Sequence, residues 1–248
     1  MTQRLQRWLR FDAQRVPVVE EAYRDFVRHS KPGVAFFIAL LIAIAAAVGL
    51  GVVLVARGWA HSRTMGPVVI TFSTVFYGSL LFAVVRSPLP VLRTMLAGAV
   101  SWPRASLLAL GLGLACVVVE LAIVSVLVLA LHLRSHSVTI DYFSGGLIAG
   151  MLVLALGAPV VEEFLMQGWL QTRVQRLGPF WAGAVTTIVF VLVHLPTSFL
   201  DLARGVALGT AAWFRATTRS MLACILVHAT NNIAIAGLLL AARVSGHR

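Results

Sequence analysis

The sequence predicts an all-α fold, a polytopic membrane helix bundle with about seven transmembrane segments, within a range of six to eight. Of its 248 residues, 59% are hydrophobic and only 12% are charged, and the mean hydropathy is +0.91. A soluble domain carries about 25% charged residues, so this composition indicates a chain that lies mostly in lipid. Apolar stretches close to the ~20 residues that a spanning helix needs recur along the chain. Short connections that contain arginine, glycine or proline separate these stretches.

Seven apolar segments are candidates for the spans. They are residues 33–56, 66–85, 105–133, 145–170, 180–200, 202–214 and 220–242. The sixth segment is short for a crossing at right angles to the membrane, so we expect it to be tilted or re-entrant. If it does not span, the C-terminus lies on the other side of the membrane.

The segment 1–32 is expected to be cytoplasmic or interfacial. It is charged and has no apolar core, so it does not have the pattern of a cleavable signal peptide. Leu5, Trp8, Leu9 and Phe11 alternate with arginines, which is typical of an interfacial amphipathic helix. A solvated leader that satisfies the positive-inside rule explains the same residues equally well.

The positive charge is interpreted as a membrane signal and not as a nucleic-acid signal. The formal net charge is +11, but the basic residues lie between the apolar stretches. Positive-inside topology and anionic lipid headgroups account for that placement. With seven spans and a cytoplasmic N-terminus, the inside segments hold 14 of the 20 Lys and Arg residues. We therefore expect an integral protein of the bacterial inner (cell) membrane, with its N-terminus in the cytoplasm and no nucleic-acid partner.

Two adjacent carboxylates, Glu162 and Glu163, lie inside an apolar stretch. A charged side chain at bilayer depth costs at least ~2.5–3.5 kcal/mol, so such residues usually mark a functional site. Neighbours on a helix point about 100° apart, which predicts that the two carboxylates cannot both face the same partner. One would then face a catalytic cavity, and the other would pack against a supporting helix. The alternative is that both are paired with arginines of other helices.

A histidine in the next apolar stretch is predicted to reach the level of the carboxylates. Gly178-Pro179 is the strong turn signal between the two stretches, and Glu162 and His194 each lie 16 residues from Gly178. An antiparallel hairpin would place both ~24 Å from the turn, at ~1.5 Å per residue. Phe190, four residues before His194, shares its helical face and would form a wall of the cavity.

His228 and Asn232 form an i, i+4 pair on one face of the last apolar segment. Both side chains can donate hydrogen bonds to a developing oxyanion, and the alternative is a polar pair that bonds a neighbouring helix. A further alternative is a Zn²⁺ site with Glu162, His194 and His228 as ligands and water in the fourth position. The helical His-Glu-x-x-His signature of many zinc proteases is absent from the sequence.

The order Glu-Glu, Phe-x-x-x-His and His-x-x-x-Asn, in three separate apolar segments, resembles the CAAX protease and bacteriocin-processing family of intramembrane endopeptidases. The resemblance covers roughly residues 145–242, which it marks as a catalytic core, with residues 33–133 as accessory transmembrane helices. It implies that Glu162 and His194 activate water, that His228 and Asn232 stabilise the oxyanion, and that Glu163 supports them. It also implies a membrane-associated protein or peptide as substrate, and it leaves open a metal-free mechanism or Zn²⁺.

One residue departs from the family pattern. The first family motif is Glu-Glu-x-x-x-Arg, and this chain has Gln167 at the arginine position. Gln167 can donate an amide hydrogen bond but brings no charge, so Glu163 needs a cation from elsewhere or should be protonated. The substitution supports an alternative hypothesis, a non-catalytic membrane scaffold or chaperone that keeps the fold. A third hypothesis is a proton-coupled transporter that uses the buried acids and histidines as a relay.

Overall fold

The computed structural model describes residues 3–57, 61–131, 157–194, 203 and 205–244, and no strand occurs in those ranges. The predicted all-α class is therefore confirmed. The helices, in chain order, are α1 (Gln3–Trp8), α2 (Arg15–Ser30), α3 (Pro32–Ala56), α4 (His61–Val85), α5 (Leu89–Ala97), α6 (Trp102–Leu131), α9 (Ala158–Glu163), the π-helix η2 (Phe164–Leu170), α10 (Gln171–Val174), the 3₁₀ turn η3 (Gln175–Leu177), α11 (Pro179–Val193), α12 (Gly205–Thr218) and α13 (Met221–Val244).

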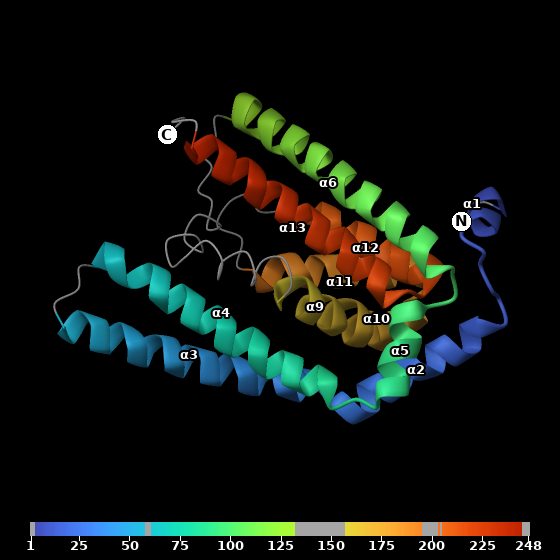
Figure 1. The fold of residues 1–248 in the computed structure, drawn as a ribbon, viewed down its shortest axis with the longest axis horizontal. Helices are drawn as coiled ribbons and strands as arrows, with labels where there is room; N and C mark the ends of the chain where they lie inside the picture. Colours follow the sequence, from blue (N-terminus) through green and yellow to red (C-terminus); the bar gives the residue numbers. More distant parts are fainter. Residues whose placement is uncertain (1–2, 58–60, 132–156, 195–202, 204, 245–248) are drawn as a thin grey trace.

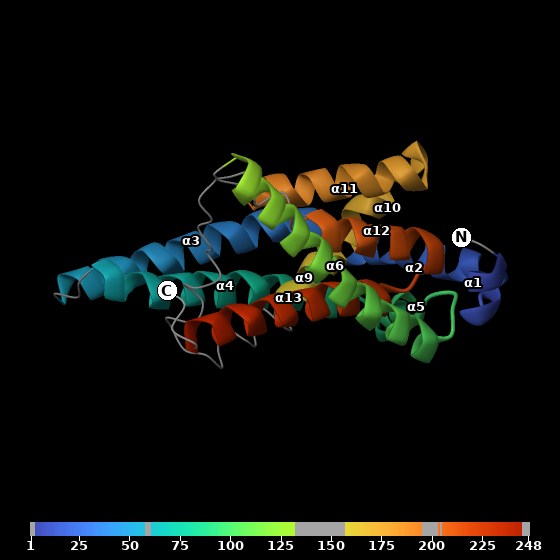
Figure 2. The ribbon, with the colours of Figure 1, turned by 90° about the horizontal axis from the view of Figure 1, so that it is seen from above.

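The helices form a bundle with two long pairs around a central group (Figures 1 and 2). Helices α3 and α4 form an antiparallel hairpin, and α6 packs along α13. Between these pairs lie α9, η2 and α10, followed by α11 and α12. The central group carries Glu162, Glu163 and His194, and the adjacent α13 carries His228 and Asn232.

By length and composition, three helices of the described ranges can cross a membrane: Gly33–Ala56, Trp102–Leu127 and Met221–Leu238. A fourth span results if α4 and α5, which meet at an angle of 103°, are counted together. Helix α11 is apolar but shorter, and α12 has 14 residues, in line with the expectation of a short sixth segment. The first part of the predicted span 145–170, residues 145–156, lies outside the described ranges. The chain is an integral membrane protein, and the predicted number of seven spans stays a prediction.

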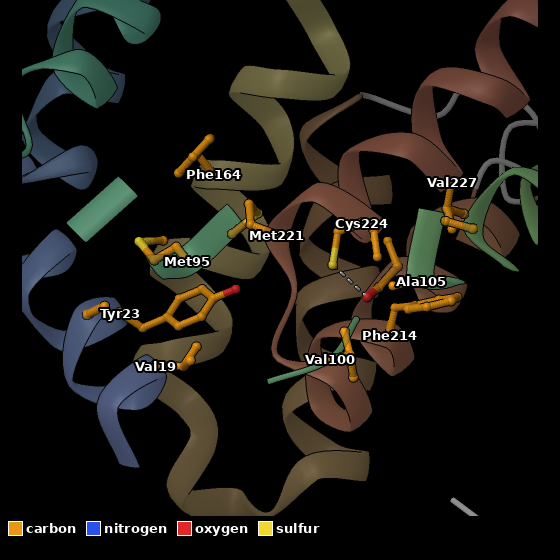
Figure 3. Packing of buried hydrophobic residues seen from close by; sticks show 14 of the residues in the cluster. Val19, Tyr23, Met95, Val100, Ala105, Phe164, Phe214, Met221, Cys224 and Val227 are labelled. Carbon is orange, nitrogen blue, oxygen red and sulfur yellow. Dashed lines mark hydrogen bonds between the residues drawn. The ribbon is translucent and has the colours of Figure 1, made fainter. Parts of the chain in front are cut away.

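The N-terminal helix α2 packs into the bundle instead of lying free in solvent. Its buried face includes Val19, Tyr23 and Phe26. Figure 3 shows Tyr23 with Met95 of α5, Phe164 of η2 and Met221 of α13. The interpretation of residues 1–32 as a solvated leader is therefore wrong, because α2 buries its apolar face in the bundle. This burial removes apolar surface from water and stabilises the position of α2.

A buried ion cluster holds α2 against the C-terminal end of α12. The guanidinium of Arg215 donates to both carboxylate oxygens of Glu20, at 3.1 and 3.3 Å, and lies 3.6 Å from the ring centre of Tyr23. Arg219 lies 2.7 Å from the same carboxylate, measured from Nε to Oε1. The hydroxyl of Tyr23 donates to the backbone carbonyl of Arg219 at 3.1 Å. The carboxylate of Glu20 thus pairs with two arginines. These contacts join the segment 1–32, which was expected to be separate from the bundle, to the end of α12.

Candidate active site

The adjacent carboxylates lie at the C-terminal end of α9, and both are buried. Glu162 retains 8% exposure and Glu163 none. Immediately after them the chain winds into the π-helix η2. π-Helical turns are rare and occur frequently at functional sites, because the wider turn re-aims the side chains around it.

Glu162 is the centre of the site, with three side chains around its carboxylate. The hydroxyl of Tyr77 on α4 donates a hydrogen bond to Oε1. Nε2 of His194 lies 3.8 Å from Oε1, and Nε2 of His228 lies 3.6 Å from Oε2. Residues from α4, α9, the end of α11 and α13 therefore meet at one carboxylate.

The distance between Glu162 and His194 confirms the prediction that the two residues lie at one level of an antiparallel hairpin. The turn is made by Gly178, whose φ of +87° favours glycine and which precedes Pro179 at the start of α11. Phe190 packs against His194 with ring centres 4.2 Å apart, and 5.9 Å from the ring of His228. It is a wall of the site, as predicted.

The hydrogen bond of His194 defines which ring nitrogen carries its proton. Nδ1 lies 2.9 Å from the backbone oxygen of Phe190. A carbonyl can only accept, so Nδ1 is the donor, and in the neutral ring Nε2 is left with its lone pair facing Glu162. A lone pair and a carboxylate oxygen repel each other unless a proton donor lies beside both of them. This arrangement is suited to a water molecule that donates one hydrogen to each.

His228 bridges the two carboxylates. Its Nδ1 lies 2.9 Å from Oε1 of Glu163, and its Nε2 faces Glu162. The prediction that the two glutamates cannot share a partner is wrong, because an imidazole has two nitrogens on different edges of its ring and each meets one carboxylate. Glu163 therefore orients His228, in the way that a carboxylate fixes the ring of a catalytic histidine.

Gln167 does not replace the missing arginine. It is fully buried and its amide interacts with Glu163, although the contact falls short of a well-formed hydrogen bond. The π-helical winding explains this, because a π-turn stacks residues five apart and moves the i+4 position away from Glu163. The partner of Glu163 is His228.

The two asparagines at the end of the motif differ in burial. Asn232 is half-buried on α13, one turn beyond His228, and its role in stabilising an oxyanion stays a prediction. Asn231, which the sequence did not single out, is buried, and its Nδ2 has no hydrogen-bond partner among the described residues. Both amides are thus on the helix that carries His228.

The assignment of Glu162, His194 and His228 as Zn²⁺ ligands stays a prediction. In the ranges that the structure describes, no three His, Cys, Asp or Glu side chains are arranged so that they could hold a metal ion. Glu162 faces His194 with Oε1, which also accepts from Tyr77, and faces His228 with Oε2. The two imidazoles therefore approach different oxygens of the carboxylate.

Tyr77 is the site residue that the sequence patterns did not indicate. It lies in an ordinary apolar span, and the sequence carries no motif around it. The one signal in the sequence was its hydroxyl, because a tyrosine within an apolar helix usually has a hydrogen-bond partner. Only the packing of α4 against α9 identifies that partner as Glu162.

Together, the fold and the site define an integral membrane protein with a buried carboxylate–imidazole centre, which is an arrangement that hydrolases use to activate water. The family model described as Type II CAAX prenyl endopeptidase Rce1-like matches residues 144–234. This match contains Glu162, His194, His228 and Asn232, and it confirms the resemblance to the CAAX protease family. No curated protein and no solved structure matches the chain. The match supports a CAAX-type intramembrane endopeptidase kind of function.

Proposed function

We propose that this protein is an intramembrane endopeptidase that hydrolyses a peptide bond of a membrane-associated protein or peptide. The observation that carries the proposal is the convergence of His194 and His228 on the carboxylate of Glu162. The gaps of 3.6–3.8 Å are longer than direct hydrogen bonds, and polar gaps of this kind are often associated with water. The family match supports the same class of reaction.

Glu162 is the general base in this proposal. It takes a proton from a water molecule that is oriented by the lone pair of His194, and the water oxygen attacks the carbonyl carbon of the peptide bond. The carbon–nitrogen bond then breaks as Glu162 returns the proton to the leaving amine. Tyr77 holds the carboxylate by its hydrogen bond, so that Oε1 and Oε2 keep their separate partners. The site opens on the side of His194, whose side chain is 29% exposed, compared with 10% for that of Glu162.

His228 and Asn232 are the proposed oxyanion donors. For His228 to donate from Nε2 while Nδ1 stays with Glu163, both ring nitrogens carry a proton. Donors aimed at the developing oxyanion lower the barrier because they are already oriented when charge appears. Glu163 acts on the reaction through His228 and is a positioning residue.

The proposal is tested by reconstituting the purified protein with membrane-anchored peptides and identifying new termini by mass spectrometry. We expect cleavage by the wild type and a fall of about 100-fold or more in kcat for His194→Ala, because the water loses its orienting partner. The control is His29→Ala, which changes a histidine outside the site whose Nδ1 bonds the backbone of Asp25. Equal cleavage by wild type and His194→Ala would contradict the proposed mechanism.

Removal of the Tyr77 hydroxyl is expected to lower kcat about 10–100-fold with little change in KM. The Tyr77 hydroxyl orients the carboxylate of Glu162, and removing a residue that orients a reacting side chain typically lowers activity by about 10–100-fold. The matched control is Tyr23→Phe, which also removes one hydrogen bond, to the backbone of Arg219, but lies outside the site. A KM effect alone, or an equal loss of kcat in both variants, would assign Tyr77 a purely structural role.

Chelation is expected to leave cleavage unchanged. Because the described residues contain no three-ligand group, we propose that the carboxylate and the two imidazoles act without a metal. The measurement is the initial rate after prolonged dialysis against a strong chelator, with added Zn²⁺ in a parallel sample. Loss of activity that Zn²⁺ restores would establish a metal enzyme and would show that the ligands rearrange.

A non-catalytic relative, acting as a membrane scaffold or chaperone, is the second candidate function. It is favoured by Gln167, a buried and uncharged amide where the family has an arginine. For this candidate, a chromosomal Glu162→Ala substitution would leave the cellular phenotype unchanged, whereas deletion of the protein would alter it. For the endopeptidase, substitution and deletion would have the same phenotype.

A further inference from the structure

A groove of about 700 Å³ opens between α3 and α4, away from the site around Glu162. Its apolar walls include Val34, Ile38 and Phe82, which are 60%, 53% and 65% exposed. Its floor includes Gly78, where an added Cβ would meet no atom within 4 Å. Exposed apolar surface of this extent, on a hairpin built from apolar helices, is suited to contact with the acyl chains of a bilayer.

One end of the groove is cationic. Lys31, which precedes α3, and Arg86, which follows α4, both line it, together with His29. No carboxylate lines the groove, and within the described part of the chain neither Lys31 nor Arg86 makes an ion pair. The nearby Asp25 is paired with Arg28. The charge at this end is therefore not neutralised by a described carboxylate, and the Arg86 guanidinium contacts the ring of Phe82, 6.0 Å from its centre.

The charged end lies where the chain leaves the apolar layer. After Arg86 the chain bends by 103° from α4 into α5, and before Lys31 it runs through the amphipathic helix α2. From Lys31 the groove extends along α3 to Ile42, a distance of ~16 Å at ~1.5 Å per residue. An anionic group at the interface and a hydrocarbon chain that extends toward the centre of the bilayer would fit the two ends.

We propose that the groove is a binding site for one anionic phospholipid of the surrounding bilayer. Its phosphate lies between Lys31 and Arg86, and one acyl chain lies along α3 over Gly78. Cationic side chains near the membrane surface attract anionic lipids, and each contributes about a five-fold preference over a zwitterionic lipid. The two cations therefore predict a preference of about 25-fold. The proposal does not rest on the peptidase function, since no lining residue is a hydrogen-bond or ion-pair partner of Glu162, His194 or His228 in the described part of the chain.

The experiment uses the full-length protein in mixed micelles with equal amounts of phosphatidylglycerol and phosphatidylcholine that carry the same acyl chains. Native mass spectrometry counts the lipids that are retained. We expect one phosphatidylglycerol per protein, with the preference given above. Lys31→Gln/Arg86→Gln should reduce the preference to near unity. The matched control Arg173→Gln/Arg176→Gln removes the same charge from another connection of the chain and should keep the preference.

A second pair of variants tests the acyl-chain half of the site. Gly78→Phe fills the groove, whereas Gly49→Phe adds the same side chain elsewhere on the hairpin, where a Cβ also meets nothing within 4 Å. Retention should be lost in the first variant and kept in the second. Glycerol phosphate should not displace the lipid. The proposal is overturned if both lipids are retained equally, if the charge variant keeps the preference, if both glycine variants behave alike, or if glycerol phosphate competes.

Discussion

Glu162→Gln is expected to lower kcat for peptide cleavage by about 1,000-fold or more. General base catalysis contributes roughly 10²–10⁴-fold, and this substitution removes the base while it keeps the size of the side chain. A glutamine oxygen can still accept the hydrogen bond from Tyr77, so the packing of α4 against α9 is retained. The measurement is the initial rate of cleavage of a reconstituted membrane-anchored peptide, with protein folding checked by thermal unfolding.

The neighbouring substitution Glu163→Gln is the control for Glu162. It weakens the hold on Nδ1 of His228 but leaves the water-activating carboxylate in place, so we expect a fall of about 10–100-fold in kcat. The two glutamates are adjacent and both buried, so a general loss of stability would affect both variants. A larger loss in Glu163→Gln than in Glu162→Gln would reverse the roles assigned to them.

Much of the site could be predicted because its residues are ionisable and lie within apolar segments. Carboxylates and imidazoles within apolar segments are costly, so Glu162, His194 and His228 are conspicuous in the sequence. The distance between Glu162 and His194 could be predicted as well, because the rise of a helix is constant and Gly178 marks the turn. In the same way, continuous apolar stretches predict α3, α6 and α13 within a few residues.

The remaining features depend on packing between elements that are distant in the sequence. Tyr77 reaches Glu162 from another helix, and no local pattern distinguishes it from other aromatic residues in apolar spans. The π-helical turn after Glu163 changes which residues share a face, and Gln167 loses the position that an i+4 rule assigns to it. The segment 1–32 was expected to be cytoplasmic or interfacial, but Glu20 of α2 pairs with Arg215, 195 residues away along the chain, and helps hold α2 in the core.

Glu20→Gln is expected to destabilise the protein by about 3 kcal/mol. Removing one partner of a buried ion pair is costly because the remaining charge stays buried without compensation, and here the carboxylate serves two arginines. Arg215 is 2% exposed and cannot turn to solvent, whereas Arg219 is 22% exposed and can do so in part. The apparent unfolding temperature should fall by about 5–10 °C. A thiol-reactive dye can measure it, because the free thiols Cys116 and Cys224 are both buried.

The pH dependence of the same contact gives a separate check. Burial alone raises the pKa of Glu20, but the guanidinium groups of Arg215 and Arg219 outweigh it and hold this pKa below its ordinary value. Because the folded pKa is the lower one, the stabilisation is complete above the pKa of the unfolded chain, ~4.3. It is lost as the pH falls through the folded pKa. The difference in unfolding temperature between wild type and Glu20→Gln should therefore be constant near neutral pH and shrink below about pH 4.

The neighbouring Glu21→Gln breaks only exposed pairs with Arg24 and Arg28 and should leave stability unchanged at every pH. Equal destabilisation by both substitutions would mean that α2 is held by its apolar face and not by Glu20.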